Sequence, residues 1–353
     1  MRDPEQPRPT TAPSLAAALS TALAFGAAAA SCAEPATGQG GGGEGPGAGG
    51  AGGGAASTTT SSSSGGVISE PDGPTRLTVV SGVVDAPAIQ LCFLAWPEPA
   101  SGASPWPAEP IAFGRAAALA LPDATIPSGS DVLVAVLSGD SGGADCATLV
   151  DDPGATAARV SVLGVFPEST FLAPRSLLLA PTGCIVEGHT EESTPSVCGP
   201  SYSPDEPTLG ATVAVLSRVT SEERVSFQAV HAASPSFSLD LAVRPSFDGA
   251  DAVVIAANLQ PGSIAPAPAF APISTAQLGS TAGATALGLV TGSPQSMIEQ
   301  SLASALAAGG LDGGAVANGR GVTLVAVGAA PGAPSLGWHE GFRILALRPD
   351  PLP

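Results

Sequence analysis

Apolar and polar residues alternate regularly in several short segments of this chain. Residues 236–243 read Ser-Phe-Ser-Leu-Asp-Leu-Ala-Val, with an apolar residue at every second place. This period of two predicts a β-strand with one buried face. Runs such as 322–327, Val-Thr-Leu-Val-Ala-Val, are almost wholly apolar and predict strands in the middle of a packed sheet. Pro, Gly, Ser and Asp cluster between these runs and supply turns. The pattern therefore predicts an all-β protein.

The apolar blocks recur in one order. The apolar positions of 77–93 reappear 148 residues later, and residues 133–139 match 286–292 at a shift of 153. Residues 160–165 then match 322–327 at a shift of 162, and 175–181 match 343–349 at 168. Tandem copies with loop insertions leave such a growing shift. We therefore expect two tandem antiparallel β-sandwich domains, immunoglobulin-like or related, at 67–181 and 224–353. Residues 182–223 would then be a linker.

One short amphipathic helix is expected inside the second domain. Ser293 followed by Pro294 predicts a capped helix start. The apolar residues after this start fall on one helical face: Met297, Ile298, Leu302, Ala305 and Leu306. Gly309 and Gly310 predict the end, after about 14 residues.

The charge of the chain narrows the function classes. The 353 residues carry 30 acidic and 12 basic side chains, a formal net charge of −18, and every basic residue is arginine. Without lysine, Schiff-base chemistry and lysine-type phosphate binding are excluded, and nucleic acid is not expected as a partner. We expect no cofactor and no metal.

The N-terminal segment predicts export. An apolar stretch from Leu15 to Ala30 ends in small residues at Cys32, and a glycine-rich run, 38–54, follows. This order resembles a bacterial lipoprotein signal, in which the cysteine becomes the lipid-bearing N-terminus after cleavage. The resemblance implies a signal peptide over 1–31, a lipid-anchor cysteine with a Gly/Ser-rich tether over 32–66, and anchoring at the outer membrane or cell surface. An ordinary secretory signal is the alternative, and it also places the mature chain outside the cytoplasm.

Four further cysteines predict two disulfides. In an oxidising compartment Cys92, Cys146, Cys184 and Cys198 would pair, and three pairings are open. Cys92 with Cys146 and Cys184 with Cys198 is favoured because each pair then stays inside one structural unit. Zinc is the competing use, but the spacing fits no zinc motif.

The second copy also resembles a known family. Residues 230–235, Val-His-Ala-Ala-Ser-Pro, precede an alternating strand. This arrangement is similar to a domain of unknown function that repeats in secreted bacterial proteins and opens with a Val-rich strand and His-Ala-Ser-Pro. The resemblance implies an all-β fold with no established activity. The first copy departs from the motif, with Val83 and Val84 in place of the His-Ala pair.

Two motifs suggest chemistry that the rest of the sequence does not support. Residues 139–143, Gly-Asp-Ser-Gly-Gly, match the catalytic-serine signature of chymotrypsin-like proteases, but that family needs an upstream histidine and the first histidine here is His189. We interpret Asp140 as a cap and Ser141 as a turn residue. The acidic residues of 140–152 suggest calcium, although their spacing matches no calcium loop. His189 lies among glutamates between Cys184 and Cys198, in a loop that is either a cation site or simply solvated.

Trp96 and Trp106 flank a proline-rich stretch that the second copy lacks. Exposed tryptophans beside proline favour a platform for a glycan or a protein ligand, although packing of a long loop onto its own sandwich explains them equally well. We therefore expect a lipid-anchored cell-envelope protein without catalytic residues, acting as a binding or spacing module. An extracytoplasmic hydrolase or a carbohydrate-binding protein is the alternative.

Overall fold

The computed structural model describes residues 73–99, 101–154, 156–172, 175–205, 209–233, 237–291, 297–333 and 335–349. The predicted signal peptide, Cys32 and the predicted tether lie outside these residues. All described residues fall within one compact unit. Strands account for 46% of the described residues and helices for 11%, so the prediction of an all-β, sandwich-like fold is confirmed.

The first half of the described chain contains two sheets. One has the order β5-β1-β8-β9, in which β1 and β8 are parallel and the other neighbours are antiparallel. The short strand β2, which follows β1 in the chain, also pairs with β8 in parallel. The other has the order β4-β3-β6-β7 and is wholly antiparallel. The bounds are β1 Thr75–Val80, β2 Gly82–Val83, β3 Ala88–Trp96, β4 Trp106–Ala112, β5 Ala116–Leu121, β6 Asp131–Ser138, α1 Cys146–Asp151, β7 Arg159–Phe166, α2 Ser169–Leu172, β8 Ser176–Gly183, α3 Thr194–Cys198 and β9 Leu209–Leu216.

The second half also contains two sheets. In the order β13-β10-β16-β17, the pair β10 and β16 is parallel, and the other neighbours are antiparallel. The order β12-β11-β14-β15 is wholly antiparallel. The bounds are β10 Val225–Ala233, β11 Leu239–Arg244, β12 Val253–Leu259, β13 Ile264–Ile273, α4 Thr275–Leu278, β14 Thr285–Val290, β15 Met297–Ser301, α5 Leu302–Ala308, the 3-10 turn η2 Gly313–Ala315, β16 Gly321–Gly328 and β17 Arg343–Leu347.

The two halves therefore have the same strand order and the same pairing directions. Strands β1, β3, β4, β5, β6, β7, β8 and β9 occupy the positions of β10, β11, β12, β13, β14, β15, β16 and β17. The parallel pairing lies at the same place in both halves, as β1 and β2 with β8 and as β10 with β16.

Two of the four sequence correspondences are wrong. Residues 160–165 belong to β7, whose counterpart is β15 and not β16; residues 175–181 belong to β8, whose counterpart is β16 and not β17. The second block needs a shift of 154 and not 153. Leu91 pairs with Val136 in the first half, and its counterpart Leu239 pairs with Val290 in the second half, which lies 154 positions after Val136. Strands with apolar residues on both faces have similar sequences. Because the connections between strands differ in length in the two halves, the sequence alignment matched the last two blocks to the wrong strand.

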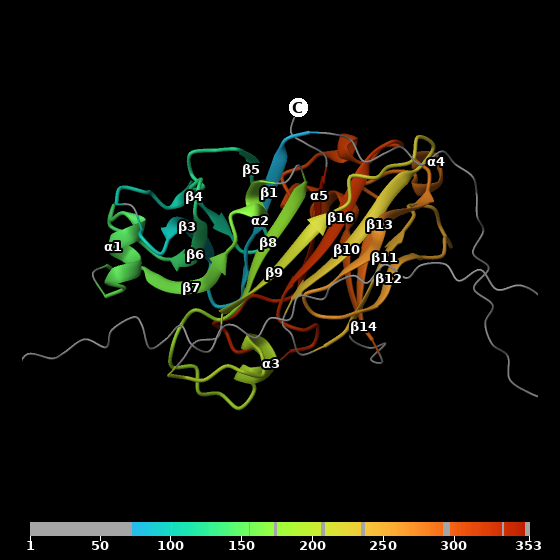
Figure 1. The fold of residues 1–353 in the computed structure, drawn as a ribbon. Helices are drawn as coiled ribbons and strands as arrows, with labels where there is room; N and C mark the ends of the chain where they lie inside the picture. Colours follow the sequence, from blue (N-terminus) through green and yellow to red (C-terminus); the bar gives the residue numbers. More distant parts are fainter. Residues whose placement is uncertain are drawn as a thin grey trace, which may run out of the picture. The chain divides into compact units, whose positions relative to one another are not determined.

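The four sheets lie beside one another in Figure 1, and clusters of apolar side chains join them into one stack. One cluster, including Leu91 and Leu179, lies between the two sheets of the first half, and another, including Phe227 and Leu241, lies between those of the second half. A third cluster, here called the central core, combines residues of β8 and β9 with residues of β10, β16 and β17. The central core therefore packs the inner sheet of one half against the inner sheet of the other.

The segment predicted as a linker is largely structured. It contains α3 and β9, and β9 pairs with β8 along its whole length from Leu209 to Leu216. Arg218, which follows β9, is 1% exposed. Its Nε donates to Ser176 Oγ at 2.9 Å and its Nη2 to the Pro74 carbonyl at 2.8 Å. The passage from the first half to the second is therefore part of the packed interior.

The inserted helix begins later than predicted. Met297 and Ile298 lie in β15, which pairs with β14, and α5 begins at Leu302 with Ser301 as its cap. Ser293 and Pro294 lie outside the described residues. Backbone pairing along the edge of β14 overrides the helical pattern of residues 297–301. The predicted apolar face from Leu302 onward is buried, and the helix ends at Gly309 as predicted.

Both predicted disulfides are present. Cys92 and Cys146 join β3 to α1 with a Cα–Cα distance of 5.5 Å, and Cys184 and Cys198 join the end of β8 to α3 with 5.1 Å. Each bond remains within the first half of the chain. The second bond closes the loop that contains His189.

The central core predicts that the two halves unfold together. Leu178 and Leu345 are both fully buried in it, one from each half. Replacing either with alanine should cost about 2–5 kcal/mol and shift one common transition in urea, followed by circular dichroism. Val254→Ala, at a site 53% exposed, is the control and should change stability by less than about 0.5 kcal/mol. A Leu178→Ala curve with two transitions, one at the wild-type midpoint, would contradict the shared core.

Candidate functional site

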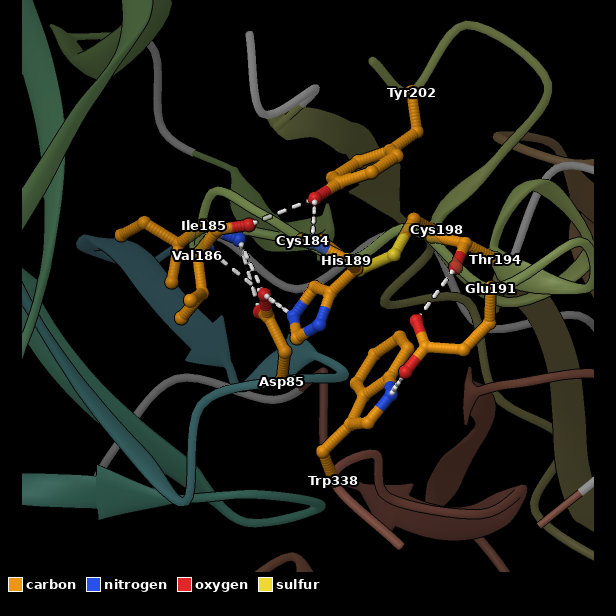
Figure 2. A network of polar contacts seen from close by, with 10 residues as sticks. All are labelled: Asp85, Cys184, Ile185, Val186, His189, Glu191, Thr194, Cys198, Tyr202 and Trp338. Carbon is orange, nitrogen blue, oxygen red and sulfur yellow. Dashed lines mark hydrogen bonds and ion pairs between the residues drawn. A yellow bond between two sulfur atoms is a disulfide. The ribbon is translucent and has the colours of Figure 1, made fainter. Parts of the chain in front are cut away.

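A polar network connects the two halves at the disulfide-closed loop (Figure 2). Asp85 lies in the turn after β2, and His189 and Glu191 lie between β8 and α3. Trp338 lies in the connection between β16 and β17, in the second half. The disulfide between Cys184 and Cys198 closes the loop that contains His189 and Glu191. It thereby fixes this loop beside the β16–β17 connection of the second half.

Asp85 is the most buried group of the network. Its carboxylate is 1% exposed and accepts hydrogen bonds from the amides of Ile185, at 2.9 Å, and Val186, at 2.8 Å. Its Oδ2 also lies 3.3 Å from His189 Nε2. Burial raises the pKa of Asp85, while the amide bonds and His189 act in the opposite direction. The carboxylate thus fixes the backbone after β8 and orients the imidazole.

His189 is enclosed between Asp85 and Trp338. Its ring stacks on Trp338 with centroids 3.6 Å apart and an interplanar angle of 11°, and its side chain is 13% exposed. Its backbone amide donates to the Tyr202 hydroxyl at 3.2 Å, and that hydroxyl donates to the Val186 carbonyl at 3.1 Å. Burial raises the pKa of Tyr202. The expectation of a solvated loop around His189 is therefore wrong for this side chain.

Glu191 completes the contact between the halves. The Trp338 indole Nε1 donates to Glu191 Oε1 at 3.1 Å, and Thr194 Oγ1 donates to Oε2 at 3.2 Å. The pKa of Glu191 lies below its usual value because its own backbone amide hydrogen-bonds the carboxylate, assisted by Trp338 and Thr194. Glu191 thus accepts a hydrogen bond at the edge of the Trp338 indole, while the His189 ring stacks on the face of the indole.

This arrangement contains a base and an orienting carboxylate. Nucleophilic catalysis also needs a hydroxyl or thiol within hydrogen-bond reach of the base. Within the described part of the chain, Asp85 is the only side chain that hydrogen-bonds the His189 imidazole. No cluster of three metal-ligating side chains occurs among the described residues, so a cation site at His189 has no ligand set there. The network suits fixing two loops together better than group transfer.

The two predicted platform tryptophans do not share a surface. Trp106 packs against the cluster between the two sheets of the first half, with its ring centroid 6.3 Å from that of Phe93. Trp96 packs against the cluster beneath α1, on the opposite face of the same sheet. The prediction of a joint platform is therefore wrong. Trp106 pairs with Leu91 of β3 and faces the same way, whereas Trp96 lies an odd number of positions after Leu91 on that strand and faces the opposite way.

The protease-like motif forms a turn between β6 and α1. Asp140 Oδ1 accepts from the Gly142 amide at 2.8 Å, and the Ser141 carbonyl accepts from Ala144. The cap of α1 is Asp145, whose Oδ1 accepts from the Thr148 amide at 2.9 Å. Asp140 is therefore a turn residue and not a helix cap. Two of the four acidic residues suggested for calcium are thus engaged in local backbone bonds.

His231 is buried inside β10 and is 0% exposed. Its Nε2 donates to the Phe237 carbonyl at 2.9 Å, and its Nδ1 accepts from the Ala233 amide at 3.3 Å. In the neutral form of the ring, one nitrogen donates and the other accepts, so both have a hydrogen-bond partner. Burial lowers the pKa of His231 to about 4, against the opposing effect of the Phe237 carbonyl. Ser234, its neighbour in the sequence motif, lies outside the described residues.

No protein-family model matches this chain, and no curated protein matches it. In the described part of the chain, no helix is long and apolar enough to cross a membrane.

The stacked pair predicts energetic coupling between the halves. His189→Ala and Trp338→Ala should each destabilise the protein, and the double variant by less than the sum. The expected coupling is about 1 kcal/mol, typical of an aromatic pair. A cycle of His189→Ala with Trp96→Ala is the control and should be additive. Additivity in the His189 and Trp338 cycle would mean that the stack carries no energy.

The His231 ring predicts a pH-dependent stability. Its folded pKa of about 4 lies below the ordinary value of 6.5, so its contribution is present above pH 6.5 and is lost as pH falls toward 4. The loss should reach about 3 kcal/mol, at 1.36 kcal/mol per pH unit of difference. Urea unfolding at a series of pH values should give a steeper decline for wild type than for His231→Gln. Parallel profiles would exclude His231 as the source.

Proposed function

We propose that this chain is an extracytoplasmic protein held to a membrane by lipid on Cys32, and that its double sandwich acts as a non-catalytic binding or spacing module. The observation that carries the proposal is the order of its segments. An apolar export stretch, a cysteine and a glycine-rich run precede a four-sheet stack that begins at β1. Two disulfides fit a location outside the cytoplasm.

The continuity of the stack supports a spacing or presenting role. The central core and the contact between His189 and Trp338 both connect the two halves. Interfaces that are large and apolar suppress relative motion of the joined parts. A rigid body that is anchored at one end presents its far surface away from the membrane.

The common pairing order supports an origin by duplication. We infer that one ancestral sandwich was copied head to tail. Two sandwiches that arose independently would have to place their parallel pairing, β1 and β2 with β8 and β10 with β16, at the same position by chance. The resemblance of residues 230–235 to the repeated secreted domain fits this inference.

Mass spectrometry of the mature N-terminus tests the anchor. The N-terminal peptide should begin at Cys32 and carry acyl chains, and the protein should sediment with membranes. Cys32→Ser should leave the protein unacylated and in the soluble fraction, with the same unfolding midpoint as wild type. An unacylated mature N-terminus at another residue would refute the lipid anchor while leaving export intact.

A further inference from the structure

The first half contains a cavity of about 780 Å³ at one end of its sandwich. The start of β1, the β5–β6 connection and α2 surround it, and Leu121, Ile126, Phe171 and Leu172 supply apolar wall. Leu172 is 60% exposed, which is high for a leucine beside a packed cluster. Volumes of about 300–1,000 Å³ are typical of sites for small organic ligands.

The same end of the second half is closed by the chain itself. There the β13–β14 connection forms α4, whose Leu278 is 0% exposed. The β15–β16 connection contributes Ala315 and Val316, and all three residues belong to the cluster between the two sheets. The chain thus fills this end of the second sandwich with small and branched apolar side chains.

Hydrogen bonds tie the two closing connections of the second half together. Thr275 donates from its amide and hydroxyl to Asn318 Oδ1 at 2.8 and 2.7 Å, and the Ala303 amide donates to the Thr281 carbonyl at 3.1 Å. In the first half the corresponding connections, 122–130 and 167–175, are shorter than 274–284 and 302–320. They meet at Glu168, whose Oε1 accepts from the Gly129 amide at 2.5 Å. The cavity is therefore the space left where shorter connections do not close the sandwich.

The charges around the cavity select the kind of ligand. Asp123 and Glu168 line it, and no arginine or histidine is among its described lining residues. Hydrogen bonds from the Thr125 side chain and backbone lower the pKa of Asp123, which favours its charged form. Arg175, which follows α2, donates to the carbonyls of Ser169 and Thr170. The lining therefore repels anions and attracts cations.

We propose that this cavity is a binding site for a small apolar amine, with its hydrocarbon part against Ile126, Phe171 and Leu172 and its ammonium group near Asp123 and Glu168. The ligand replaces the apolar side chains that the second half supplies for itself. The site lies wholly within the described residues and does not depend on lipidation of Cys32.

Fluorescence of N-phenyl-1-naphthylamine, an uncharged apolar probe, tests the site in the full chain. The probe should brighten on binding, and octylamine should displace it at lower concentration than octanol, with octanoate the weakest. Leu172→Arg should weaken probe and octylamine binding about tenfold or more, equivalent to 1.4 kcal/mol. Val254→Arg places the same charge at a similarly exposed site in the second half and should bind as wild type.

A second variant separates charge from apolar contact. Glu168→Gln keeps an oxygen acceptor for Gly129 and should leave octanol displacement unchanged. It should weaken octylamine about threefold, as for a partly exposed ion pair. Glu299→Gln, in β15, is the matched control. No probe binding by wild type, equal effects of Leu172→Arg and Val254→Arg, or displacement by octanoate as readily as by octylamine would overturn the proposal.

Discussion

The structure depends on the burial of apolar residues between the two inner sheets. All nine residues of β10 are buried. Its odd positions, such as Phe227, enter the core of the second sandwich, while its even positions, such as Val230, enter the central core. Separating the halves would expose Val230, Val325 and Leu345 to water, at about 25 cal/mol for each Å² of apolar surface. Two sandwiches thus fold as one body, and the inner strands are apolar on both faces.

The sequence was informative where local rules decide the structure. Alternation at 236–243 marked β11, cysteine arithmetic identified both disulfides, and Gly309 marked the end of α5. It misled where tertiary pairing decides. Residues 297–301 have a helical pattern but find partners along β14, and residues 209–216 read as a linker but complete the first inner sheet. Doubly buried strands carry no periodic signal, so β8, β16 and β17 could not be distinguished.

The polar network that connects the two halves could hardly be predicted from the sequence. Asp85 and His189 are separated by 104 positions, and Glu191 and Trp338 by 147. None of these residues lies in a motif, so only the fold brings them together. The one available signal was a pair of cysteines that flank a histidine and glutamates. It predicted the disulfide-closed loop but not the contact of this loop with Trp338. Trp96 and Trp106 carried a stronger sequence signal but occupy opposite faces of one sheet.

The differences between the halves are as informative as their common pairing. The first half has two disulfides, and its shorter β5–β6 and β7–β8 connections leave the cavity at one end. The second half has none of these cysteines, and it closes the same end with α4 and with Ala315 and Val316 of the β15–β16 connection. The strands that build the cores are similar, while the connections differ. Binding sites commonly arise on connections held by a rigid scaffold, and the cavity beside α2 follows that rule.

Native-state hydrogen exchange tests the shared core most directly. Amides of β8 in the first half and of β16 in the second should exchange last, with one common free energy equal to that of global unfolding. Their free energies should fall together as denaturant is added. If β8 exchanged through an opening that left β16 protected, or the reverse, the two halves would be independent domains and the account of one continuous stack would be wrong.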